Sequence, residues 1–242
     1  MRVWVESELA APSPGEFFEA LGKLGKQRWK LSYRQPPTTG IGNRLRIAIA
    51  AGTILADGMV AAVARDVQQV KNVTGDLRLF CKSLGIEKLM TDRIRDIDMM
   101  AERDSWDGLL REYEAATREL ERQLRKQRDT HLAILMEVGL ALRVYDIGCE
   151  IVAGKHTREG ALLVTKPRLI EAALLRLRSL PLEVQKDPLV EYLTARLSTI
   201  YRLSQPEPRD MDDPVLEQYE VAALRELTAT TVEKATQKPS TK

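Results

Sequence analysis

The chain has 242 residues, of which 44% are hydrophobic and 30% are charged. This balance is typical of a folded protein with one sizeable core or two small ones, and it argues against extensive disorder. Lysine and arginine together number 37 and aspartate and glutamate 35, so the formal net charge is only +2. That excess is too small to indicate a nucleic acid or a membrane surface as the partner.

Aromatic residues make up only 5% of the chain, whereas alanine, leucine, arginine and glutamate are abundant. The abundant residues favour helices, and the aromatic and β-branched runs that favour strands are few. The composition therefore predicts an all-α protein, and the pattern along the chain predicts a helical bundle of about seven to nine helices with a long central helical hairpin. We expect an N-terminal helix and wrapping segment (1–42), a central helical bundle (43–154), C-terminal helices (155–236) and a disordered tail (237–242).

The first predicted helix begins at Pro14, because Ser13 and Glu16 have the spacing of a capping box around it. Prolines and glycines between residues 34 and 42 end the helical pattern. They predict a linker, or a segment that wraps over the rest of the chain.

The least polar stretch, RIAIAAGTILADGMVAAVAR, covers residues 46–65 and predicts a long helix from about residue 43 to about residue 72. It is barely long enough to span a membrane, and it is built largely from alanine. Asp57 would lie near the bilayer centre at a cost of about 2.5–3.5 kcal/mol, which alanine does not offset. We therefore interpret the stretch as a buried helix and expect no membrane span.

Two shorter helices are predicted next. Thr74 has the character of an N-cap for a helix that Gly85 ends. A further helix carries Ile94 and Ile97 on its apolar face.

The proline-free stretch 105–154 contains the predicted hairpin. Between residues 110 and 138 its apolar side chains recur at spacings of three and four, which is the pattern of a seam in a coiled coil or an antiparallel bundle. The stretch predicts either one very long helix or two helices with a break at residues 128–130.

Three helices are predicted in the C-terminal part, over residues 167–181, 186–204 and 214–235. Residues 155–166 have the pattern of a loop with a short turn. A proline-rich, acidic connector precedes the last helix.

Polar stripes on the two most apolar helices form the candidate site. Arg46 and Asp57 share one stripe of helix 43–72, because eleven residues are almost three whole turns. Arg143, Asp146 and Glu150 share one stripe of helix 131–153. Antiparallel packing would pair Asp57 with Arg143 and bring Arg46 toward Asp146 or Glu150. Parallel packing would bring Arg46 toward Arg143 and Asp57 toward Glu150, so charge pairing favours the antiparallel arrangement.

This hypothesis has two versions. In the first, the charges form partly buried salt bridges that fix the register of the bundle, since buried charges are normally paired. In the second, Asp57, Arg143 and Asp146 line a polar pocket that binds a small ligand. The first version is favoured.

Metal and cofactor chemistry have little support in the sequence. The only histidines, His131 and His156, belong to no Glu-x-x-His or His-x-x-x-His arrangement, so we expect no metal and no cofactor. No catalytic residue is assigned, because no GxSxG, P-loop or GxGxxG motif is present. Cys81 and Cys149 are expected to be two buried thiols, with one disulfide as the alternative.

The first functional hypothesis is a non-catalytic helical scaffold or protein-interaction protein, able to self-associate through the seam at residues 110–138. The alternative is a small-molecule-binding protein or an enzyme with a polar pocket between helices 43–72 and 131–153. No nucleic-acid partner is expected, because arginines in residues 118–128 alternate with glutamates that would repel phosphates. The N-terminus lacks the pattern of a secretory signal, so we expect a cytoplasmic protein; an exported form without its leader would have the same sequence.

Overall fold

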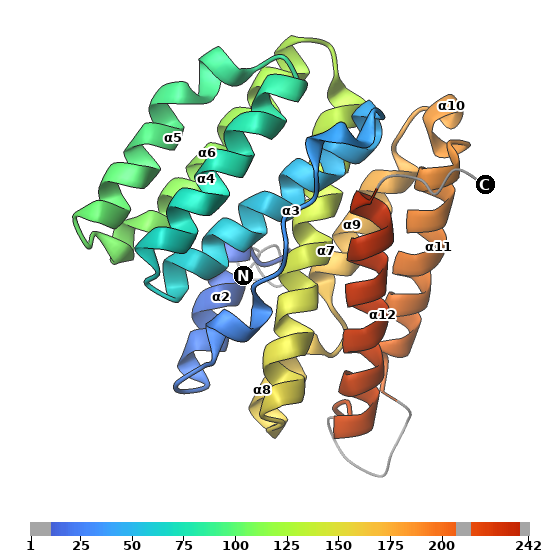
Figure 1. Cartoon of the computed structure of the whole chain (residues 1–242). Helices are drawn as coiled ribbons and strands as arrows, with labels where there is room; N and C mark the ends of the chain where they lie inside the picture. The colour runs from blue at the N-terminus through green and yellow to red at the C-terminus, as the bar shows by residue number, and fades with distance from the viewer. Residues whose placement is uncertain (1–10, 207–213, 238–242) are drawn as a thin grey trace, which may run out of the picture.

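A computed structural model of the chain describes residues 11–206 and 214–237 (Figure 1). Within these ranges the chain is helical and contains no strand, and nine of its α-helices have ten or more residues, which confirms the predicted all-α bundle. The α-helices are α2 (Pro14–Lys23), α3 (Arg44–Val63), α4 (Val67–Ser83), α5 (Glu87–Glu102), α6 (Trp106–Lys126), α7 (Thr130–Gly154), α8 (Arg158–Val164), α9 (Arg168–Arg178), α10 (Leu182–Gln185), α11 (Pro188–Leu203) and α12 (Gln218–Thr236). The predicted tail lies outside the described residues except for Gln237, as does most of the connector before α12.

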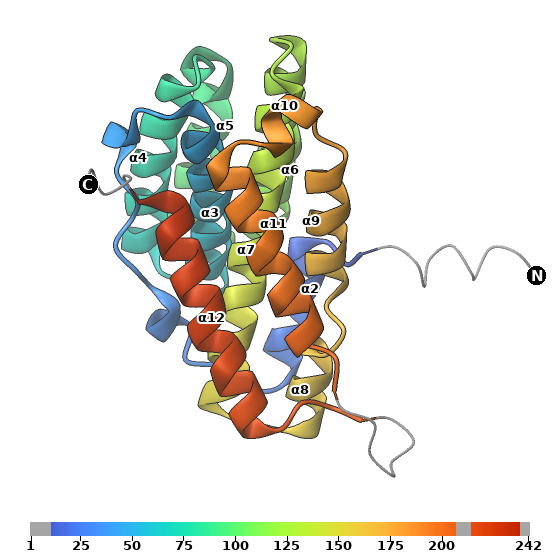
Figure 2. The same ribbon diagram turned by 90° about the vertical axis from the view of Figure 1, so that its right-hand side faces the viewer.

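Helices α3 and α7 lie at the centre of the molecule. Helices α4, α5 and α6 cover one side of this pair, and α9, α11 and α12 cover the other (Figures 1 and 2). Every residue from 47 to 62 of α3 is buried. Among the described helices, α3 alone is long and apolar enough to cross a membrane, and 83% of its apolar window is buried inside the fold.

The backbones of α3 and α7 touch at two glycines. A Cβ atom on Gly52 would lie 1.9 Å from the carbonyl oxygen of Met136, and one on Gly139 would lie 2.2 Å from that of Ile49. Only glycine permits this approach, because any side chain would enter the facing backbone. The contact fixes the register of the two central helices.

The two central helices run in the same direction, so the predicted antiparallel packing is wrong. Arg44, at the start of α3, pairs with Asp129, just before α7, at 2.7 Å. Further along, Gly52 lies against Met136 and Leu140. Short connections join each helix from α3 to α7 to the next, and successive helices that pack on each other alternate in direction, so α3 and α7 run parallel. Charge pairing between Asp57 and Arg143 is satisfied in this parallel register as well.

Two helix boundaries differ from the predictions. The single helix predicted over 43–72 breaks after Val63, where Arg65 has a φ of +52° and the side chain of Asp66 caps α4 by accepting from the amide of Gln69. The predicted start at Thr74 is wrong, because its hydroxyl bonds to the carbonyl of Lys71 within α4. A short polar side chain after a left-handed residue ends and restarts the helix without glycine or proline.

The predicted hairpin is present as two helices. Arg128, with a φ of +64°, separates α6 from α7, so the version with a break is the one observed. Leu110, Leu120 and Leu124 of the seam are buried within the chain, since α6 packs on α3, α5 and α7. Elsewhere Ser13 caps α2 as predicted, and part of the stretch predicted as a loop forms α8.

We predict that Gly139→Ala lowers the free energy of unfolding by about 3 kcal/mol or more, because the methyl group would meet the backbone of α3. Gly75→Ala in α4 is the matched control, since a Cβ there meets no atom within 4 Å. It should stabilise the protein by about 0.5–1 kcal/mol. Urea denaturation measures both values, and a Gly139→Ala protein as stable as the wild type would contradict the backbone contact.

Candidate functional site: buried charges beneath a strap

An extended segment, residues 33–38, connects the short 3-10 helices η1 (Trp29–Ser32) and η2 (Thr39–Ile41). We call it the strap. Pro36 and Pro37 lack amide hydrogens and disfavour helix in the residue before them, which explains the extended backbone. The strap passes over the central helices in Figure 1, and η1 packs on both α3 and α7.

The predicted contact between Asp57 and Arg143 is present. The Arg143 Nε atom donates to Asp57 Oδ1 at 2.7 Å, and the two residues are only 5% and 9% exposed, respectively. The second carboxylate oxygen of Asp57 accepts from Arg34 Nε at 2.9 Å. Arg34 belongs to the strap, so Asp57 holds one arginine from α7 and one from the strap.

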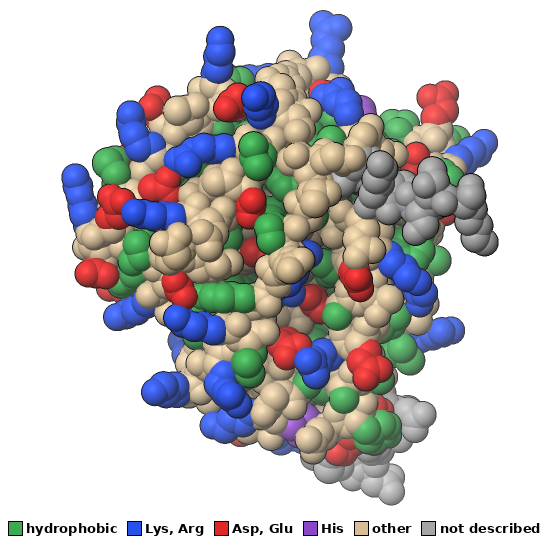
Figure 3. Space-filling view, in the orientation of Figure 1, with side chains coloured by type: hydrophobic (Ala, Val, Ile, Leu, Met, Phe, Trp, Pro, Cys, Tyr) green, Lys and Arg blue, Asp and Glu red, His purple; other side chains and the backbone are tan. Residues whose placement is uncertain are grey.

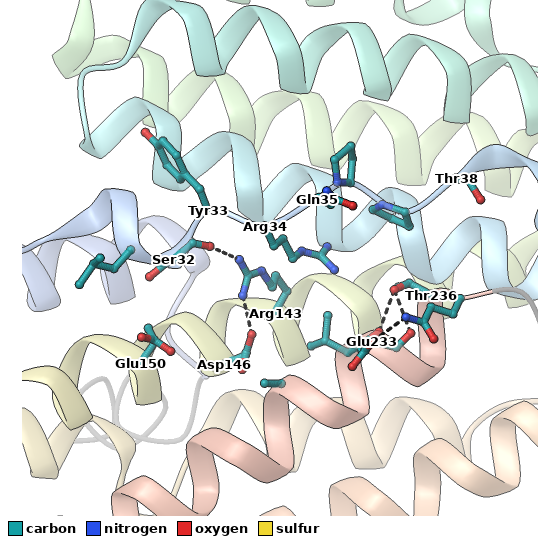
Figure 4. A pocket seen from close by; sticks show the side chains of 16 residues that line it. Ser32, Tyr33, Arg34, Gln35, Thr38, Arg143, Asp146, Glu150, Glu233 and Thr236 are labelled. Carbon is teal, nitrogen blue, oxygen red and sulfur yellow. Dashed lines mark hydrogen bonds and ion pairs between the residues drawn. The ribbon is translucent and has the colours of Figure 1, made fainter.

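The remaining nitrogens of Arg143 are also occupied. Nη1 donates to Asp146 Oδ2 and Nη2 donates to the carbonyl oxygen of Ser32, each at 2.5 Å. Dashed lines in Figure 4 mark both contacts. The other oxygen of Asp146 accepts from the Thr228 hydroxyl at 2.7 Å. Together Arg34, Asp57, Arg143 and Asp146 form a charged cluster that joins the strap, α3, α7 and α12.

The electrostatics of the cluster favour its charged form. Burial by itself would raise the pKa of Asp57, but the charges and hydrogen bonds of Arg143 and Arg34 outweigh it and lower that pKa below the ordinary value. Burial likewise disfavours the Arg143 cation, and Asp57 and Asp146 together raise its pKa. The pair therefore remains ionised at neutral pH inside the fold.

Two predicted site residues lie outside the cluster. The Arg46 Nη1 atom donates to the carbonyl oxygens of Lys234 at 2.6 Å and Ala235 at 3.2 Å, at the end of α12. Glu150 forms an ion pair with Arg225 of α12. The predicted approach of Arg46 to the carboxylates of α7 is wrong, because parallel packing places Arg46 at the opposite end of α7 from Glu150.

Cavities lie on both sides of the strap. The α12-side cavity, about 540 Å³, is bounded by the strap, α7 and α12, and Asp146 and Glu150 line it. The α4-side cavity, about 690 Å³, is bounded by the strap, α3 and α4. Both are walled by the same strap residues, 33–36, and the charged cluster lies between them.

Two kinds of chemistry, metal binding and thiol reactivity, have no site among the described residues. In the described part of the chain, no group of three or more histidine, cysteine, aspartate or glutamate residues is placed to hold a metal ion. Cys81 and Cys149 are buried and unbonded, as expected for two thiols. Burial raises the pKa of the Cys81 thiol to about 12, which leaves it protonated and unreactive.

Sequence reasoning missed the contributions of the strap and α12. Arg34 lies among prolines, where no helical periodicity indicates its direction, and Ser32 contributes its backbone carbonyl. Thr228 lies more than 80 residues from Asp146 in the sequence. The one signal in the sequence was the charge imbalance of the polar stripe on α7, where the single cation Arg143 accompanies the carboxylates of Asp146 and Glu150.

The chain matches no protein-family model, and comparisons with curated proteins and with solved structures find no match. On the face that Figure 3 shows, basic and acidic side chains are interspersed.

We predict that Arg143→Met lowers the free energy of unfolding by about 3–5 kcal/mol at neutral pH, because it leaves buried carboxylates without their main partner. In the wild type, the lowered pKa of Asp57 contributes stability above pH 4 that is lost as the pH falls through the folded-state pKa. In the variant, burial should raise the pKa of Asp57. The loss of unfolding free energy relative to the wild type should therefore be smaller at pH 5 than at pH 8.

Urea titrations of both proteins at pH 5 and pH 8 measure this difference. Arg225→Met is the control, since it removes the partner of Glu150 from a half-exposed ion pair. Its effect should stay within about 1 kcal/mol at both pH values. An Arg143→Met deficit that is equally large at both would contradict the ionised cluster.

Proposed function

We propose that the protein is a non-catalytic binding protein for a small polar molecule, which it holds in the α12-side cavity beneath the strap. The observation that carries the proposal is the Ser32 hydroxyl. Ser32 is 5% exposed, lines this cavity, and its Oγ has no hydrogen-bond partner among the described residues. A buried hydroxyl without a partner is costly, and a ligand in the cavity would supply one.

The volume and walls of the cavity suit such a ligand. Binding sites for small molecules typically measure about 300–1,000 Å³ and combine apolar walls with a few fixed polar groups. Here Ala229 and Val232 of α12 provide apolar surface, and Glu233 and Thr236 of the same helix provide polar groups. The buried cluster provides a rigid floor, because each nitrogen of Arg143 is held by a partner.

The strap provides a route of entry. Within the described residues, the backbone of the strap makes one hydrogen bond to other backbone, from the amide of Tyr33 to the carbonyl of Lys30. The Arg34 side chain and the neighbouring Ser32 carbonyl anchor it to the cluster. A segment with so few backbone bonds opens at low free-energy cost compared with the helices beneath it.

The scaffold hypothesis receives less support. It invoked self-association through the seam at residues 110–138, but Leu120 and Leu124 of that seam are fully buried within one chain. A scaffold function would need a different surface. The small-molecule function is therefore the one that we favour, because a cavity and an unsatisfied polar group support it.

We predict that a thermal-shift panel of sugars, amino acids, nucleosides and small amines contains a compound that stabilises the wild type. At 100 times its Kd, a ligand adds about 2.7 kcal/mol of stability, which corresponds to roughly 5–10 °C in a chain of this size. Ala229→Phe should abolish the shift, because Ala229 is an exposed residue that lines the cavity and the larger side chain would fill it.

Ala223→Phe is the matched control. Ala223 is an exposed alanine of the same helix that does not line the cavity, so this variant should keep the full shift. A shift that both variants retain would place the ligand elsewhere and contradict the proposed site. Absence of any stabilising compound in the panel would count against the proposed function.

A further inference from the structure

The α4-side cavity is separate from the proposed binding site and lies across the strap from it. Its walls come from the strap, α3 and α4, and its volume is about 690 Å³. The charged side chains that line it are Arg34, Asp57 and Asp76. Of these, Arg34 and Asp57 are already paired with each other at 2.9 Å.

Asp76 therefore leaves one negative charge without compensation. Within the described residues, its carboxylate has no ion pair and no hydrogen bond, and the only charged group that acts on it is Asp57. Burial, followed by the charge of Asp57, raises the pKa of Asp76. A half-buried carboxylate beside a second carboxylate is stabilised by any cation that enters the cavity.

The other walls suit the body of an organic molecule. Tyr33 belongs to this wall, and Figure 4 shows its side chain projecting away from Arg143. Ile54 and Val73 add apolar surface. The side-chain amides of Gln69 and Asn72 add polar groups. A carboxylate beside an aromatic ring and aliphatic side chains is a combination that recognises ammonium and guanidinium groups.

We propose that the α4-side cavity binds a small organic cation, in which an ammonium or guanidinium group pairs with Asp76 and a short aliphatic chain lies against Ile54 and Val73. The cavity offers an anion no free cation, because Arg34 is held by Asp57. It suits a bare metal ion poorly, because Asp57 already accepts from two arginines and leaves Asp76 as the one unpaired carboxylate in the lining.

Isothermal titration calorimetry of the full chain with 1,4-diaminobutane tests the proposal, with 1,4-butanediol as the neutral probe and MgCl₂ as the metal probe. The diamine should bind saturably at physiological ionic strength, and the diol and Mg²⁺ should bind at least about tenfold more weakly. Asp76→Asn should weaken diamine binding by at least about tenfold. The variant should remain folded, since it removes a carboxylate that faces another carboxylate.

Asp92→Asn is the matched control, because the side chain of Asp92 on α5 is 83% exposed and lies outside the cavity. It should bind the diamine like the wild type. Three results would overturn the proposal: no saturable diamine binding, equal binding of diamine and diol, or unchanged binding by Asp76→Asn. Tighter binding of Mg²⁺ than of the diamine would overturn it as well, in favour of a metal site.

Discussion

Direct contact between the backbones of α3 and α7 is the constraint on which the other features depend. Gly52 and Gly139 allow the two helices to touch, and the register that results brings Asp57 and Arg143 together inside the protein. Buried charges require partners. Arg34 and Asp146 therefore complete the cluster, which attaches the strap and α12 to the central pair.

This arrangement gives the cluster a structural role and also positions the cavities. Since every nitrogen of Arg143 is engaged, this side chain serves as a rigid wall and offers no free donor to a ligand. The free groups lie beside it, namely the Ser32 hydroxyl on one side of the strap and the Asp76 carboxylate on the other. A structural role for the cluster and a binding function beside it are therefore compatible in this fold.

The fold class and the polar stripes that carry Asp57 and Arg143 could be predicted from the sequence, because composition reports helix preference and spacing reports which side chains share a helix face. The contact between these two residues is present, but it was expected only for antiparallel helices. The antiparallel prediction for α3 and α7 rests on charge pairing alone and is wrong, because the short connections between successive helices from α3 to α7 leave these two parallel. The break at Arg65 has no glycine or proline to mark it. Arg34 reaches the site from a segment without periodicity, so its role follows only from the three-dimensional structure.

The most direct test of this account is a double-mutant cycle between Asp57 and Arg143. Urea denaturation of the wild type, Asp57→Asn, Arg143→Met and the double variant gives the coupling free energy of the pair. We expect a coupling of about 2 kcal/mol or more, because the pair is buried and shares a hydrogen-bonded cluster. The exposed pair Asp92 and Arg95 should give less than about 0.5 kcal/mol in a parallel cycle. A coupling between Asp57 and Arg143 as small as that of the exposed pair would contradict the account.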